Sequence, residues 1–316
     1  MDYEHNKIII SQNPSEDGVF YDFLGLKNLP VAKSSIASFY LERYPITYED
    51  YLDRFNSVKD SLRRGNSYLV NLTFPTLVQT NLSMQDLFLQ TTANFKGYVP
   101  DEFVFFSPER FVDIIDDQVY TYPMKGTIDA SLPDAEEQIL NDPKEMAEHS
   151  TVVDLLRNDL SQMCRQVRVN RFRYIDRIVS HDRELLQICS EISGQLMEPL
   201  AGNLGDILFS LLPAGSISGA PKTKTLEIIK QAEIAPRQYY TGICGHYDGN
   251  NLKSGVMIRM IQLDDHDNMY YYSGGGITAQ SDPVKEYQEL IDKVYVPITG
   301  DHQNKRRQDL QYSVSQ

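Results

Sequence analysis

PAGSISGAPK, residues 213–222, joins two glycines, two prolines and small residues, a composition that predicts a turn or loop. The following residues, 221–232, predict a helix, so the stretch is expected to be a flexible loop that runs into a helix N-terminus. Backbone N–H groups in such a loop can hold an anion. An ordinary tight turn is the competing interpretation, because glycine turns are common in proteins.

Two segments on either side of this loop resemble each other: DPKEMAE at 142–148 and DPVKEYQE at 282–289. In each, Asp can cap a helix and Pro can occupy its first position. Each helix then carries two glutamates three residues apart, on one face. These are Glu145 and Glu148 in the first helix, and Glu286 and Glu289 in the second. Four gathered carboxylates would require a cation such as Mg²⁺, although single acidic residues near a helix start also simply favour the helix dipole.

Three further features are ambiguous when each is taken alone. Lys125 lies in YPMKGT, residues 122–127, where a strand is expected to end. A lysine near another cation or an apolar wall can become a nucleophile, but an exposed surface lysine is the simpler interpretation. Glu109 could equally form an ordinary salt bridge. Gly274, Gly275 and Gly276 follow a tyrosine-rich strand and would let a backbone approach a ligand, or make a tight turn.

The composition limits the class of protein. The 316 residues carry a formal net charge of −14, which argues against a nucleic-acid partner, since phosphate binding requires clustered Lys and Arg. Small anionic substrates remain compatible with a few local cations. The three cysteines form no disulfide framework, and no apolar run approaches the length of a membrane span. A cytoplasmic protein without a membrane partner is expected.

Hydrophobic periodicity predicts a strand-rich chain with its helices concentrated towards the end. Helices are expected at 47–64, 143–163, 204–212, 221–232 and 283–293. Strands are expected at 68–74, 103–106, 110–115, 118–122, 172–179, 185–196, 240–247, 252–263 and 269–273. Because strands and helices do not alternate regularly, the fold class is expected to be α+β.

Taken together, these motifs resemble the chorismate-utilising enzymes, a family that includes anthranilate, aminodeoxychorismate, isochorismate and salicylate synthases. The resemblance covers roughly residues 60–297 and rests on SPERF (107–111), PMKGT (123–127), Glu148 with DLLRND (154–159), PAGSISGAPK (213–222), VMIRM (256–260), SGGGI (273–277) and EYQELIDK (286–293). It implies a single large α+β domain of two face-to-face, antiparallel-rich β-sheets flanked by helices. Residues 1–60 would form a short segment packing on the core, 61–299 the chorismate-binding catalytic region, and 300–316 a polar tail.

The resemblance also implies roles for individual residues. Glu148 and Glu289 correspond to Mg²⁺ ligands, with Glu145 and Glu286 beside them as water-mediated partners, and the ion would hold the ring carboxylate. The residues expected to contact chorismate are Arg259 on the enolpyruvyl group, Lys293, Gly126, Thr127, Gly274, Gly275 and Gly276. The segment Arg157-Asn158-Asp159 is expected to be mainly a structural network.

Lys125 resembles the lysine of aminodeoxychorismate synthases, where the other members usually have alanine. The implied reaction is covalent: the Lys125 amine attacks C2 of chorismate while Glu109 protonates the departing C4 hydroxyl. Ammonia then attacks C4 and expels the lysine, which gives 4-amino-4-deoxychorismate for 4-aminobenzoate and folate synthesis. The alternatives are anthranilate synthase component I and a catalytically silent chorismate-binding subunit.

Several positions depart from the family pattern. Leu69 stands where isochorismate-type members have a lysine base, which counts against that activity. Gln187 replaces a histidine expected near the ring, His246 replaces a tyrosine, and both are expected among the substrate-binding residues. Cys244 lacks the sequence context of an amidotransferase nucleophile and is expected to be an ordinary strand residue. Ammonia is therefore expected from a separate glutamine amidotransferase subunit.

Overall fold

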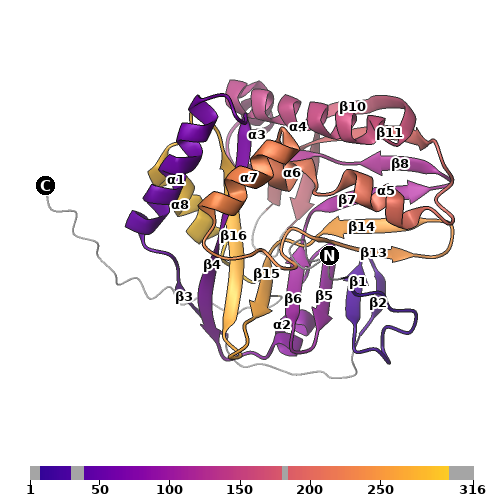
Figure 1. Cartoon of the computed structure of the whole chain (residues 1–316), viewed down its shortest axis with the longest axis horizontal. Helices are drawn as coiled ribbons and strands as arrows, with labels where there is room; N and C mark the ends of the chain where they lie inside the picture. The colour runs from indigo at the N-terminus through magenta and orange to yellow at the C-terminus, as the bar shows by residue number, and fades with distance from the viewer. Residues whose placement is uncertain (1–7, 30–38, 180–183, 299–316) are drawn as a thin grey trace, which may run out of the picture.

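The computed structural model describes residues 8–29, 39–179 and 184–298 and contains two β-sheets (Figure 1). The first has the order β12-β4-β16-β15-β6-β5-β1-β2, and β3 also pairs with β4. Its strands are β1 Phe20–Phe23, β2 Leu26–Asn28, β3 Leu41–Tyr44, β4 Leu69–Thr80, β5 Phe95–Val99, β6 Phe103–Ser107, β12 Gly219–Ala220, β15 Met260–Leu263 and β16 Met269–Ile277. Each pair in this order is antiparallel.

The second sheet has the order β10-β11-β8-β7-β14-β13, with β9 also paired to β11, and all its pairs are antiparallel. Its strands are β7 Arg110–Ile115, β8 Gln118–Thr121, β9 Met124–Asp129, β10 Cys164–Val179, β11 Glu184–Leu196, β13 Ile243–Tyr247 and β14 Leu252–Val256. In Figure 1 its strands cross those of the first sheet at a steep angle. The sheets touch where Gly255 faces Phe95, since a Cβ on Gly255 would lie 2.5 Å from that ring.

Helices cover the outer faces of the sheets (Figure 1). Their bounds are α1 Tyr48–Arg63, α2 Met84–Gln90, α3 Ala135–Asn141, α4 Pro143–Ser161, α5 Leu204–Leu211, α6 Gly215–Ser218, α7 Lys222–Ala232 and α8 Pro283–Asp292. One core lies between α4, α5 and the second sheet. Another joins α1, α7 and α8 to β4 and β16. The predicted α+β fold of two antiparallel sheets flanked by helices is confirmed.

Most predicted elements are present, and the helix expected at 47–64 begins as predicted. Thr47 caps α1, its side chain accepting a hydrogen bond from the backbone N–H of Asp50 at 3.2 Å. Within the described ranges, no helix has the length and apolar character needed to cross a membrane. The predicted polar tail, 300–316, lies outside the described residues.

Four local predictions were wrong. Residues 213–222 are not an open loop: they form α6 and β12, and Ala214, Ile217 and Ser218 are buried. Lys125 is the second residue of β9 instead of ending a strand, because after a break at residues 122–123 the chain continues in the same direction along β11. The three glycines at 274–276 lie inside β16 and pair with β4. The strand expected at 252–263 is two strands in different sheets, separated at Arg259, whose φ is 54°.

Candidate active site

The first part of the candidate site is a contact between β9, β11 and the start of α4. Lys125 pairs with Ile188, and after an irregularity Thr127 pairs with Gln187, whose amide donates to the Thr127 hydroxyl at 3.5 Å. Gly126 has a φ of 71°, and a Cβ there would lie 2.6 Å from Oε2 of Glu145. The glycine therefore allows the first turn of α4 to approach β9, and the structure brings the predicted PMKGT, Glu145 and Gln187 positions together.

The Lys125 side chain is partly buried, and among the described residues no hydrogen-bond or ion-pair partner holds its amine. The positive charge of Lys125 affects the pKa of His149, which is fully buried on α4. Burial first, then the charges of Arg173 and Lys125, lower the pKa of His149 to about 4. His149 is therefore neutral near pH 7, and its Nε2 lies 2.7 Å from the Ser190 hydroxyl.

His149 was missed from the sequence. His149 directly follows the predicted Mg²⁺ ligand Glu148. It also lies four residues after Glu145, so its imidazole and the Glu145 carboxylate are on the same face of α4. Its position in the chain was available as a signal. Its burial was not, because that depends on how α4 lies on β11.

The second part of the site joins β16 to α8. The Lys293 amine donates to the carbonyl oxygen of Gly274 at 2.8 Å and lies 2.6 Å from Oε1 of Glu289. A Cβ on Gly275 would lie 3.4 Å from Oε2 of Glu286 and 3.6 Å from Oε1 of Glu289. Gly274 and Gly275 of β16, both α8 glutamates and Lys293 therefore form one group. Asp282 caps α8 as predicted, accepting from the N–H groups of Val284 and Lys285.

Arg259 connects with this second group. One guanidinium nitrogen donates to the Lys293 carbonyl oxygen at 3.2 Å, and the guanidinium lies 5.0 Å from the centre of the Tyr295 ring. Its Nε is buried and has no hydrogen-bond partner. In the described part of the chain, no carboxylate forms an ion pair with Arg259. A partly buried cation with an unsatisfied donor is well suited to bind an anion.

Tyr240 is a second residue that sequence reasoning missed. It is 5% exposed, and burial raises the pKa of its hydroxyl to about 12, on which the charges of Arg237, Arg259, Glu233 and Glu109 also act. The charges of the predicted acid Glu109 and of the predicted anion ligand Arg259 thus both influence the pKa of the Tyr240 hydroxyl. The Glu109 backbone is fixed by a bond from its N–H to the Ser107 hydroxyl at 3.1 Å.

His246 lies away from the Gln187 group. Its strand, β13, is separated from β11 by β14, β7 and β8. Four strand spacings of about 4.8 Å place His246 roughly 19 Å from β11 across the sheet. The His246 ring instead lies 6.1 Å from the ring of Tyr21 in β1. The structure therefore does not bring His246 and Gln187 together, although both were predicted to be substrate-binding residues.

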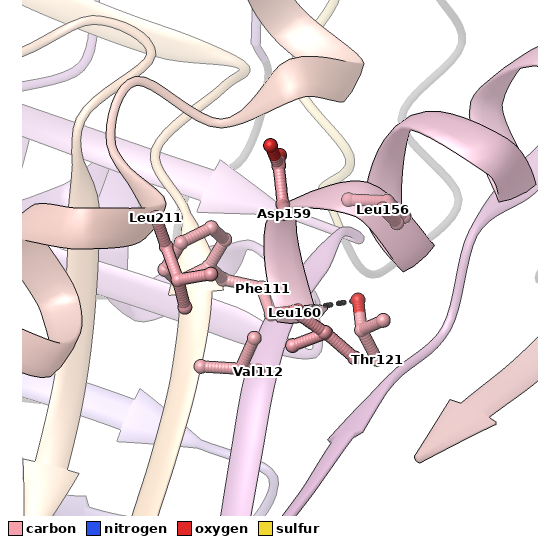
Figure 2. A pocket seen from close by; sticks show the side chains of 7 residues that line it. All are labelled: Phe111, Val112, Thr121, Leu156, Asp159, Leu160 and Leu211. Atoms are coloured by element: carbon pink, nitrogen blue, oxygen red, sulfur yellow. Dashed lines mark hydrogen bonds between the residues drawn. The ribbon is translucent and has the colours of Figure 1, made fainter. Parts of the chain in front are cut away.

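The segment Arg157-Asn158-Asp159, expected to be mainly a structural network, forms ion pairs that hold α4. Asp159 lies 2.8 Å from the Lys222 amine, and Arg157 pairs with Asp154 at 2.9 Å. Burial raises the pKa of Asp159 although Lys222 opposes the shift. Figure 2 shows the Asp159 carboxylate turned away from the apolar side chains of a neighbouring cavity of about 10 Å³. A cavity of that size holds at most a water molecule, so it is not a substrate pocket.

The carboxylates fit a magnesium ion only if water and substrate oxygens fill the rest of its coordination sphere. Nowhere in the described ranges do three or more His, Cys, Asp or Glu side chains gather as a complete metal site. Mg²⁺, however, commonly takes one or two carboxylates and fills its remaining positions with water and substrate oxygens. Gly126 lets the Glu145 carboxylate lie close to the β9 backbone, and Gly275 does the same for Glu286 and Glu289 at β16, so each half of the site can supply one or two carboxylates.

Comparison with known proteins identifies the family. Residues 21–299 match the model of the chorismate binding enzyme family. The chain belongs to this family. An uncharacterized PabA-like protein from Haemophilus influenzae is 48% identical over 302 residues, covering 95% of this chain and 92% of the relative. Aminodeoxychorismate synthase component 1 from Escherichia coli is 31% identical over 265 residues, covering 79% of this chain and 57% of the relative.

Among solved structures, anthranilate synthase component I from Streptococcus pneumoniae has a TM-score of 0.68 at 25% identity. The match covers 80% of this chorismate-binding chain and 58% of that structure. The chain therefore spans a little over half the length of the synthases it matches. Family membership agrees with the resemblance inferred from the motifs.

Proposed function

We propose that the chain is the chorismate-aminating component of an aminodeoxychorismate synthase. The observation that carries this proposal is Lys125: a partly buried amine, without a partner among the described residues, beside a neutral imidazole and the first turn of α4. A structural lysine would be expected to have an acceptor. An amine that must attack a substrate needs a free lone pair and no acceptor that holds it away from the substrate.

In the proposed reaction, the Lys125 nitrogen forms a bond to C2 of chorismate and the ring double bonds shift. The C4–O bond breaks, and Glu109 donates a proton so that the oxygen leaves as water. Ammonia then forms a bond to C4, the C2–N bond breaks, and the lysine is released. The sum is chorismate plus ammonia giving 4-amino-4-deoxychorismate plus water, with the enolpyruvyl group retained.

The other residues would bind and orient the substrate. Arg259, with its unsatisfied Nε, would hold the enolpyruvyl carboxylate, and Lys293 would approach the second carboxylate from beside Gly274. Bound Mg²⁺ would neutralise the ring carboxylate, with Glu148 and Glu289 as its protein ligands. The transfer of these roles rests on the family and on the two groups of contacts described above.

Ammonia is proposed to come from a separate glutamine amidotransferase subunit, with which the names of the relatives are consistent. Cys244 does not serve as an alternative nucleophile, because burial raises the pKa of its thiol to about 12 and its sulfur contacts the Gly255 carbonyl oxygen at 3.5 Å, which is no base. The free thiols of Cys164, Cys189 and Cys244 are compatible with the reducing cytoplasm, where we place the protein.

Product identity tests the proposal. The chain is supplied with chorismate, Mg²⁺ and ammonium, with and without an aminodeoxychorismate lyase. We expect 4-aminobenzoate only when the lyase is present. Fluorescent anthranilate formed without lyase would instead establish the alternative, anthranilate synthase component I. Chorismate binding without either product would support the catalytically silent subunit.

A further inference from the structure

Lys59 is a buried lysine outside the residues assigned so far. It lies on α1 and is 9% exposed, and its amine donates to the carbonyl oxygens of Ala279 at 2.9 Å and Ser281 at 2.7 Å. The amine also lies 5.5 Å from the centre of the Phe55 ring. Burying an ammonium group is costly unless it is well hydrogen-bonded, so this lysine is held in a specific arrangement.

The segment that Lys59 holds leads directly into α8. Residues 278–282 form a turn in which the Thr278 N–H donates to the Ser281 hydroxyl and the Ser281 N–H donates to the Thr278 carbonyl. Asp282 then caps α8. Because this turn is short and internally bonded, fixing its carbonyl groups fixes the starting point and direction of the helix.

Helix α1 and the residue pair that leads into it also support α8 one turn later. The Tyr287 hydroxyl donates to the Ile46 carbonyl oxygen at 2.7 Å, and the rings of Tyr51 and Tyr287 lie 5.1 Å apart. Burial and the charges of Glu286 and Glu289 raise the pKa of Tyr51, so those carboxylates lie near its hydroxyl. Tyr51 of α1 therefore lies close to the two glutamates of α8.

We propose that Lys59 is a positioning residue for the α8 half of the active site: by holding the carbonyls of Ala279 and Ser281, it sets α8 so that Glu286, Glu289 and Lys293 meet Gly274 and Gly275. The inference rests on the proposed chorismate and Mg²⁺ site. Lys59 itself contacts neither substrate nor metal in this proposal. It acts through the position of the helix.

The test compares Lys59→Met with Val58→Ala, a core change at the neighbouring, fully buried position of α1. Thermal unfolding of each full-length variant is followed with chorismate at increasing Mg²⁺, and turnover is titrated with Mg²⁺ in parallel. We expect Lys59→Met to raise the Mg²⁺ concentration for half-maximal chorismate-dependent stabilisation about tenfold, as for other groups that orient metal ligands. Turnover at saturating Mg²⁺ should fall much less. Val58→Ala should lower the unfolding temperature without this change, and Lys59→Arg should restore most of the wild-type value.

Equal Mg²⁺ titrations for Lys59→Met and wild type would overturn the proposal, as would an equal change in Val58→Ala at matched loss of stability. So would a wild-type chain whose unfolding temperature does not respond to chorismate and Mg²⁺ together. The thermal readout does not depend on which product is formed. If chorismate and Mg²⁺ stabilise the chain but no amination product appears, the proposed function fails while the role of Lys59 is still decided.

Discussion

At the scale of single residues, the decisive atom is the Lys125 nitrogen. We predict that Lys125→Ala reduces ammonia-dependent consumption of chorismate to background, because the variant lacks the amine proposed to attack C2. The fold should be retained, since the side chain has no partner among the described residues. Lys224→Ala, at an exposed lysine paired with Glu227, is the control and should keep full activity. Wild-type turnover in Lys125→Ala would remove the covalent mechanism.

The glutamates differ in their expected importance. We predict that Glu148→Gln or Glu289→Gln weakens the response to Mg²⁺ more than Glu145→Gln does, because the first two are the proposed direct ligands and an amide oxygen carries no charge. Magnesium titrations of initial rate give the comparison directly. Three superimposable curves would reject this choice of ligands.

Asp113 gives a prediction about pH. It is 6% exposed, and burial raises its pKa although Arg110, a bond to Ser254 and Lys253 oppose the shift. A carboxyl group with a raised pKa binds protons more readily in the folded chain, so its contribution to stability falls as pH rises above about 3.8. Asp113→Asn should therefore gain stability relative to wild type between pH 4 and pH 7. Paired thermal unfolding across this range measures the difference, and a constant difference would contradict the shift.

Individual contacts were predictable only where the residues are close in sequence or share a motif. The pairing of Glu289 with Lys293 follows from their spacing on one helix. The burial of His149 and the position of Tyr240 beside Arg259 depend on how separate elements pack, so they could not be predicted. His246 was predicted to bind substrate because it stands where the family usually has a tyrosine, but strand order places it far from Gln187 and beside Tyr21.

At the scale of elements, Gly126 determines how closely α4 approaches β9. We predict that Gly126→Ala destabilises the fold by about 1 kcal/mol or more, since alanine is strained at its φ of 71°. The new Cβ would also displace Glu145, so the Mg²⁺ response should weaken. Gly202→Ala is a matched control, because Gly202 has a φ of 84° but nothing within 4 Å of the added Cβ. It should lose stability and keep its Mg²⁺ response.

The elements themselves were mostly predictable, with instructive exceptions. Residues 252–263 have strand-forming residues throughout, and the left-handed conformation of Arg259 that divides β14 from β15 has no local sequence signal. In residues 213–222, glycine indicated flexibility, but Gly219 is needed for contact. A Cβ there would lie 1.9 Å from the Leu69 carbonyl oxygen, so the glycine allows β12 to pair with β4.

At the scale of the whole molecule, the Asp159–Lys222 pair joins two distant motifs. Their side chains are 10% and 24% exposed, and the pair links α4 to the start of α7. Lys222→Met would leave the buried carboxylate without its cation, and we predict a loss of about 2–3 kcal/mol in the free energy of unfolding, slightly below values for fully buried pairs. Denaturant unfolding measures it. The double variant with Asp159→Asn should recover part of the loss, and no recovery would mean that the pair is not the cause.

The fold class was predictable because the motifs resemble a family, and the strand content agreed. The pairing of strands was not. β4 and β16 pair along Val70–Val78 and Met269–Ile277, about two hundred positions apart, and local patterns carry no information about such partners. The division of the chain between the two sheets likewise follows from the order of strands in space and not from any change in composition.

That division has a consequence for how the molecule is made. The second sheet uses strands only from Arg110 to Val256, whereas the first draws on strands from both before and after that stretch. On a ribosome, the glycine strand and α8 emerge last and must find β4 and α1, which were synthesised long before. We expect pulse-labelled amides of β7, β8 and β11 to gain protection before those of β16, so that the group formed by β16 and α8 assembles last.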